Sequence, residues 1–194
     1  MSRNRSIGDD TILTQGGRQR NDETDFAAVN PAVHRASTVL FDNMADFMHR
    51  QERAYDGYPY GTSGTPTARS LEKAIAALEN GTRSIVTSSG MTAIGLCLLT
   101  FLKSGDHVLV PDCVYGTTRA FCDRLLKRLD ISATFYDPTI GERVDDLIGP
   151  DTSMLLLEAP GSLTLEMQDI PAMVQVARQK NVLTVMDNTW ASPL

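Results

Sequence analysis

A chain of 194 residues is long enough to form one domain with a sizeable hydrophobic core. Apolar residues make up 42% of it and charged residues 22%, as is typical of a globular protein, and the formal net charge of −6 argues against a general nucleic-acid-binding protein. No apolar run approaches the ~20 residues that a membrane span needs, and the polar N-terminus lacks the apolar core of a signal peptide.

The three cysteines are Cys97, Cys113 and Cys122. Their number is odd and their spacing fits no metal-ligand pattern, so no metal site is predicted. Cys97 and Cys122 fall in apolar helical patterns and are interpreted as core residues. Without an export signal, a reducing cytoplasm is the expected location.

Residues 1–60 are expected to form an N-terminal arm and a loop, and residues 61–194 the main domain. The first 25 residues are polar and should need a partner surface to become ordered. Asp42 is predicted to cap a short helix that follows it. Residues 54–70 are dense in Tyr, Gly, Thr and Pro; this composition suits contact with a ligand or a partner, although a plain connector has it too. Thr65 and Pro66 then begin a helix with proline at its first position.

The most informative stretch runs from residue 86 to residue 116. Residues 85–87 suit a strand, Ser88 or Ser89 can cap the helix that follows, and Gly90 lets the backbone turn sharply into it. The next strand is predicted at residues 107–110. A helix N-terminus at the end of a strand offers free backbone N–H groups, which suit a phosphate, but an ordinary strand–helix turn with a good cap has the same sequence.

Strands and helices keep alternating after this stretch, which predicts the α/β class with a mostly parallel sheet. Helices are expected at residues 117–129, 142–148 and 169–181, and strands at residues 131–136, 154–157 and 182–186. Residues 154–157 are apolar throughout, as in strands buried on both faces, and residues 182–186 are expected to form another buried strand. Because the sequence stops directly after a strand, we expect the domain to be truncated.

Three features should meet at the carboxyl edge of this sheet, where functional groups gather in open α/β folds. They are the Ser-Ser-Gly-Met turn at residues 88–91, Tyr115 after one strand and Asp187 after another. Together they would hold a flat, cationic, phosphorylated ring, and pyridoxal phosphate fits that description. Taken singly, Tyr115 could be a half-buried core tyrosine and Asp187 a turn or capping aspartate.

The sequence resembles the Cys/Met-metabolism family of pyridoxal-phosphate enzymes from about residue 11 to residue 194. The matching segments are TQGGRQ (14–19), AVNPAV (28–33), SSGMTAI (88–94), GDHVL (105–109) and MDNTWASPL (186–194). EAPGSLTLEMQDIP (158–171) and FYDPTIG (135–141) are similar to the β-lyase branch, whereas γ-synthases and γ-lyases usually have Ser-Asn-Pro in place of Pro160, Gly161 and Ser162.

This resemblance implies the aspartate-aminotransferase-like fold (fold type I), pyridoxal 5′-phosphate as cofactor, and β-elimination of cystathionine to homocysteine, pyruvate and ammonia. Gly90 and Met91 would give backbone N–H groups to the cofactor phosphate. Tyr115 would stack on the pyridine ring and could assist proton transfer, and Asp187 would pair with the ring nitrogen. Tyr60 matches the tyrosine that family members lend to the neighbouring subunit's phosphate, which implies a homodimer or homotetramer.

Two departures from the family pattern stand out. Thr62 occupies a position where the family usually has an arginine. The lysine that bonds to the cofactor lies beyond the aspartate in this family, and none of the lysines of this chain matches its motif; they are Lys73, Lys103, Lys127 and Lys180. We therefore expect an N-terminal part of the enzyme that is inactive alone. Another family chemistry, such as a γ-lyase or a sulfhydrylase, and a non-catalytic truncated product are the alternatives.

Overall fold

The computed structural model describes residues 29–192, which fall into two compact units. One unit ends at Val86 and the other runs from Thr87 to Ser192. The predicted arm of residues 1–25 lies outside the described residues. The domain boundary expected at residue 60 stays a prediction.

The first unit holds short helices: α2 (Met44–Met48), η1 (Arg50–Arg53), η2 (Gly61–Ser63) and α3 (Pro66–Leu78). The cap of α2 is Asn43, whose side-chain oxygen accepts the Asp46 N–H at 3.0 Å, so the assignment of Asp42 as the cap was wrong by one residue. Asn43 lies three residues before the N–H that it accepts, which is the usual spacing of an N-cap. Helix α3 begins as predicted, with the Thr65 side chain accepting the Ala68 N–H.

An arginine–glutamate pair ties the tyrosine-rich loop to α3. The Arg69 guanidinium bonds to Glu72 at 2.7 Å and donates to the carbonyl oxygens of Ala54 and Ser63. Glu72 also accepts the backbone N–H of Val86 at 3.2 Å. A charged group that is hydrogen-bonded on several sides orders the backbone around it, so this loop has a fixed course within its unit.

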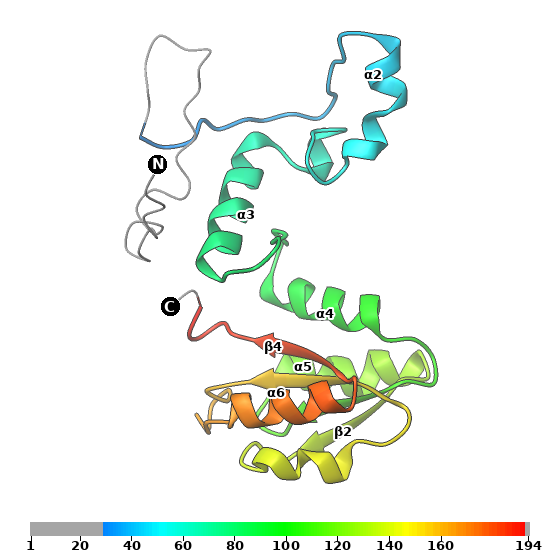
Figure 1. Ribbon diagram of the computed structural model, residues 1–194, viewed down its shortest axis with the longest axis vertical. Coiled ribbons are helices and arrows are strands. Elements are labelled where there is room, and N and C mark those ends of the chain that lie inside the picture. The colour runs from blue at the N-terminus through cyan, green and yellow to red at the C-terminus, as the bar shows by residue number, and fades with distance from the viewer. Residues whose placement is uncertain (1–28, 193–194) are drawn as a thin grey trace, which may run out of the picture. The chain divides into compact units, whose positions relative to one another are not determined.

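The second unit is a four-stranded parallel sheet in the order β2-β1-β3-β4 (Figure 1). Its strands are β1 (His107–Pro111), β2 (Ser132–Tyr136), β3 (Thr152–Glu158) and β4 (Leu183–Asp187). Its helices are α4 (Gly90–Phe101), α5 (Gly116–Phe121), the π-helical turn η3 (Cys122–Leu126), the 3₁₀ helix η4 (Gly141–Leu147) and α6 (Ile170–Gln179). The alternation confirms the predicted α/β class.

Alternate residues of β1 and β3 build a core on each face of the sheet, as the two-residue period of a strand requires. Val108, Val110, Met154 and Leu156 pack with residues of α4, α5 and η3 on one face. On the other face, the core consists of Leu109, Tyr136, Val144, Leu155, Leu157, Met173, Ala177 and Val182, contributed by the sheet with η4 and α6. Helices therefore cover both faces of the two central strands. The carboxyl ends of the strands are left uncovered and can form a site.

Two strand predictions were wrong, both because a strand depends on its neighbours. Residues 85–87 form no ladder with any described residue, and Ile85 is 68% exposed. Strand β4 does form, but it lies at the edge of the sheet with β3 as its neighbour, so it is not buried on both faces: Leu183 is 40% and Met186 38% exposed. Among residues 29–192, no helix has the length and apolarity required to cross a membrane.

Candidate functional site

The N-terminus of α4 offers backbone donors. The Ser89 backbone is extended, and its hydroxyl accepts the Thr92 N–H at 3.1 Å, which caps the helix. In the described part of the chain, the N–H groups of Gly90 and Met91 have no acceptor. A Cβ atom at position 90 would meet nothing within 4 Å, and both residues line a pocket. This arrangement suits an anion such as a phosphate.

Tyr115 follows β1 and precedes α5. Its side chain is half exposed, and its backbone N–H donates to Oε2 of Glu158 at 3.0 Å. The Glu158 carboxylate therefore anchors the turn that carries the ring. Because the Tyr115 side chain is half exposed, its ring surface is available for stacking.

Asp187 is the last residue of β4, and its Oδ1 atom accepts two hydrogen bonds from Thr189. The backbone N–H donates at 3.0 Å and the hydroxyl at 2.5 Å. Among the described residues, Oδ2 has no partner, so this oxygen is free to accept from a cationic ligand.

Glu158 is the last residue of β3 and lies opposite Asp187 in the parallel register. Only 7% of its surface is exposed. Burial raises the pKa of the Glu158 carboxyl, the N–H bond from Tyr115 opposes that shift, and the Asp187 charge adds to it. Because Oε2 of Glu158 is bonded to the Tyr115 N–H, Asp187 supplies the carboxylate oxygen that suits a ligand with a cationic group.

These groups line one pocket of about 530 Å³ in the second unit. The pocket is lined by Ser89, Gly90, Met91, Ile94, Tyr115, Thr117, Glu158, Pro160, Gly161, Ser162, Leu163, Leu165, Asp187, Thr189 and Trp190. The structure thus brings together four residues that were predicted from the sequence: Gly90, Met91, Tyr115 and Asp187.

The fifth predicted site residue, Tyr60, belongs to the first unit, where its hydroxyl shares a hydrogen bond of 3.0 Å with the Ser37 hydroxyl. Its role towards a neighbouring subunit stays a prediction.

Glu158 and the apolar wall of Leu163, Leu165 and Trp190 were not predicted from the sequence to have a role. A signal for Glu158 was present, since it follows an apolar strand just as Asp187 does. No local pattern marks the wall, because its residues come from loops whose course depends on contacts far along the chain.

The loop after β3 is fixed against the turn after β1. The Ser162 N–H donates to the Cys113 carbonyl at 2.9 Å, and the Gly161 N–H and C=O bond to Glu166 and Leu165. A Cβ atom at position 161 would lie 2.6 Å from the Cβ of Cys113, which only glycine avoids. This close approach sets the position of the pocket wall.

The geometry agrees with what comparisons with known proteins show. The family model for "Cys/Met metabolism PLP-dependent enzyme" matches residues 10–194. The chain is 40% identical to "Cystathionine beta-lyase" of Haemophilus influenzae over 94% of this chain and 46% of that protein. It is 37% identical to "L-alanine/L-glutamate racemase" of Wolbachia pipientis over 96% of this chain and 48% of that protein.

A solved structure leads to the same fold. The crystal structure of metB from Corynebacterium glutamicum superimposes with a TM-score of 0.86 at 28% identity, covering 97% of this chain and 46% of that one. The chain therefore spans about half the length of the relatives it matches. With the family model matching nearly all of it, the chain belongs to the Cys/Met metabolism family of PLP-dependent enzymes and has the fold type I architecture of that family.

Proposed function

We propose that this chain forms the cofactor-binding half of a pyridoxal-phosphate-dependent carbon–sulfur lyase, whose substrate is cystathionine and whose products are homocysteine, pyruvate and ammonia. The observation that carries the proposal is the single pocket into which free N–H groups, an exposed aromatic ring and a carboxylate oxygen converge. The Haemophilus influenzae relative named for this activity supports the choice of substrate.

The residues present fit pyridoxal phosphate. The N–H groups of Gly90 and Met91 would hold its phosphate, the Tyr115 ring would lie against the pyridine ring, and Oδ2 of Asp187 would accept from the protonated ring nitrogen. The chemistry that the cofactor supplies when bound is the withdrawal of electrons from the substrate Cα.

The chain's own residues supply orientation and charge. Asp187 would keep a proton on the ring nitrogen, because a carboxylate next to a cation stabilises the charged form. The Tyr115 hydroxyl would move a proton near the substrate amine or Cα. Leu163, Leu165 and Trp190 give one side of the pocket an apolar lining. In the overall reaction, the Cα–H and Cβ–S bonds break and the sulfur takes up a proton and leaves as the thiol of homocysteine. Water then hydrolyses the remaining three-carbon imine, which breaks its C–N bond and gives pyruvate and ammonia.

A second candidate is amino-acid racemisation, which the Wolbachia pipientis relative favours. Racemisation shares the loss of the Cα proton but returns a proton to Cα and leaves Cβ intact. Pyruvate from cystathionine would indicate β-elimination, 2-oxobutyrate would indicate γ-elimination, and D-alanine from L-alanine would indicate racemisation. This assay uses the chain joined to the C-terminal half of the Haemophilus influenzae relative, and absence of pyruvate with either other product would exclude the lyase proposal.

Cofactor binding is tested on the 194-residue chain with pyridoxine 5′-phosphate, which keeps the ring and phosphate but has no aldehyde and so needs no lysine. Asp187→Asn should weaken binding about tenfold, because the amide loses the ionic partner of the ring nitrogen. Asp146→Asn, at an exposed position on η4 outside the pocket, is the matched control and should bind like the wild type. Equal affinity for the two variants would contradict the role of Asp187.

A further inference from the structure

Glu158 stands out as a nearly buried carboxylate with a rigid backbone. Its own carbonyl accepts a hydrogen bond from Nε2 of Gln168 at 2.7 Å. The Oε1 atom of Gln168 accepts from the Tyr136 hydroxyl at 3.1 Å, and Tyr136 is 2% exposed. A buried network of this kind fixes the end of β3, and with it the start of the Glu158 side chain.

Tyr115, in contrast, has few constraints of its own. Within the described residues its hydroxyl makes no hydrogen bond, and its side chain is half exposed. Its backbone N–H is bonded to Oε2 of Glu158 at 3.0 Å, across 43 residues of sequence. The carboxylate is therefore the link between the rigid end of β3 and the turn that carries the ring.

We propose that Glu158 is a positioning residue for the Tyr115 ring: its side-chain oxygen anchors the turn after β1 and so sets the plane against which a pyridine ring stacks. This proposal rests on the proposed function, because the ring that would stack on Tyr115 is the pyridine ring of the cofactor. It adds a residue to the site that acts through Tyr115 and does not itself need to touch the cofactor.

The charges around Glu158 indicate that its role depends on accepting a hydrogen bond and not on an ion pair. The groups facing it are the Tyr115 and Ser162 N–H groups, the Cys113 thiol from the turn after β1, and Asp187 from β4. In the described part of the chain, no lysine or arginine lies against it. A neutral amide acceptor of the same shape should therefore replace the carboxylate.

The experiment compares Glu158→Ala with Glu158→Gln in the 194-residue chain. The first readout needs no ligand: hydrogen exchange of the Tyr115 amide by NMR. Glu158→Ala should speed this exchange about tenfold, whereas Glu158→Gln should keep it close to the wild-type rate, because an amide oxygen still accepts the bond. The amides of Leu155 and Leu157, which lie in the ladder of β3 with β4, are the internal control and should not change in either variant.

The second readout is the affinity for pyridoxine 5′-phosphate. It should fall about fivefold in Glu158→Ala and stay within about twofold in Glu158→Gln. The proposal is overturned if Tyr115 exchange is unchanged in Glu158→Ala, if the strand amides speed up by the same factor, or if Glu158→Gln behaves like Glu158→Ala. If the wild type fails to bind the ligand, the proposed function fails, while the exchange measurement still decides the role of Glu158.

Discussion

The contact between Gly161 and Cys113 provides the most direct test of how the pocket wall is built. In Gly161→Ala the new Cβ would lie 2.6 Å from the Cβ of Cys113 and closer still to its Sγ. Carbon atoms pack at about 3.5–4.0 Å, so one side must retreat by about 1 Å. The Gly161 backbone is bonded through both its N–H and its C=O, and Cys113 is 8% exposed, so neither side has free space.

Overpacking of this kind costs about 1–3 kcal/mol, which corresponds to a fall in Tm of about 2–12 °C for a chain of this size. Urea and thermal unfolding measure it, with Gly149→Ala as the matched control, because a Cβ there meets only the Thr152 hydroxyl at 3.9 Å. In the Gly161→Ala variant, adding Cys113→Gly removes both clashing atoms and should recover more than about 1 kcal/mol of stability. Adding Cys113→Ala leaves the 2.6 Å contact and should not recover it. Equal stability of Gly161→Ala and Gly149→Ala would refute the reasoning.

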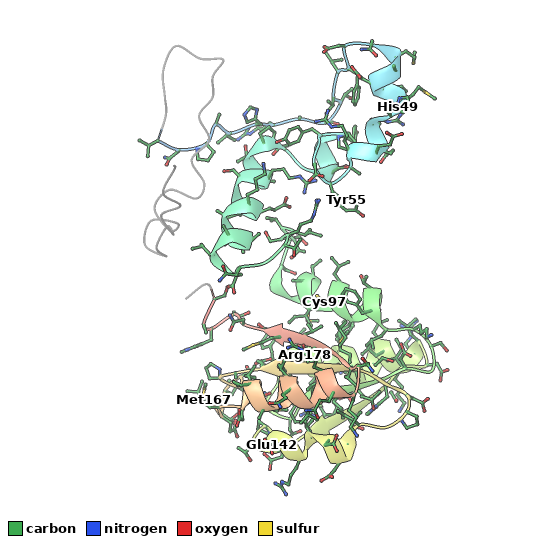
Figure 2. The ribbon with its side chains drawn as sticks, viewed as in Figure 1. His49, Tyr55, Cys97, Glu142, Met167 and Arg178 are labelled. Carbon is green, nitrogen blue, oxygen red and sulfur yellow. The ribbon has the colours of Figure 1, made fainter. Side chains whose placement is uncertain are left out.

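Three further predictions concern the second unit. Burial lowers the pKa of His107 from its usual 6.5, so the folded state prefers the neutral ring; stability should fall as the pH drops through 6.5, and His107→Gln should reduce this slope in urea titrations at pH 7.5 and 5.5. Burial raises the pKa of Cys122 to about 11, so only about 0.1% of it is thiolate at pH 8, and peptide mapping should find a thiol reagent on the half-buried Cys97 of α4 (Figure 2) well before Cys122. Ser89→Ala removes the cap of α4 and should cost about 1 kcal/mol in urea unfolding, most of which Ser89→Asp should restore.

The features that the sequence predicted well are those set by short stretches of chain. Ser89 was one of two expected caps for α4, and its hydroxyl makes the capping bond. The apolar run in β3 predicted a strand buried on both faces, and residues 154–157 are at most 1% exposed. The strand-end rule placed Tyr115 and Asp187 at the same edge, and both line the pocket.

The features that the sequence predicted poorly depend on pairing between distant segments. Residues 85–87 have the composition of a strand, but a strand forms only against a neighbour. The facing of Glu158 and Asp187 follows from the register of β3 and β4, which no local pattern encodes. The contact of Gly161 with Cys113 joins residues far apart in the chain, and a glycine in a loop does not reveal what lies against it.

The π-helical turn after α5 bears on how this protein tolerates insertions and deletions. Thr118, Cys122 and Leu126 are all buried although they are spaced by four residues. In a uniform α-helix, each such step overshoots a full turn by about 40°, and the three side chains would drift around the axis. The wider turn of residues 122–126 takes up one more residue than an α-turn and cancels much of that drift. The π turn thus contains one residue more than the regular α-helix would have at this place. Removing the exposed Asp123 should let the segment close into regular α-helix while the residues after it keep their register with the sheet, so gaps in alignments with relatives are expected at this turn.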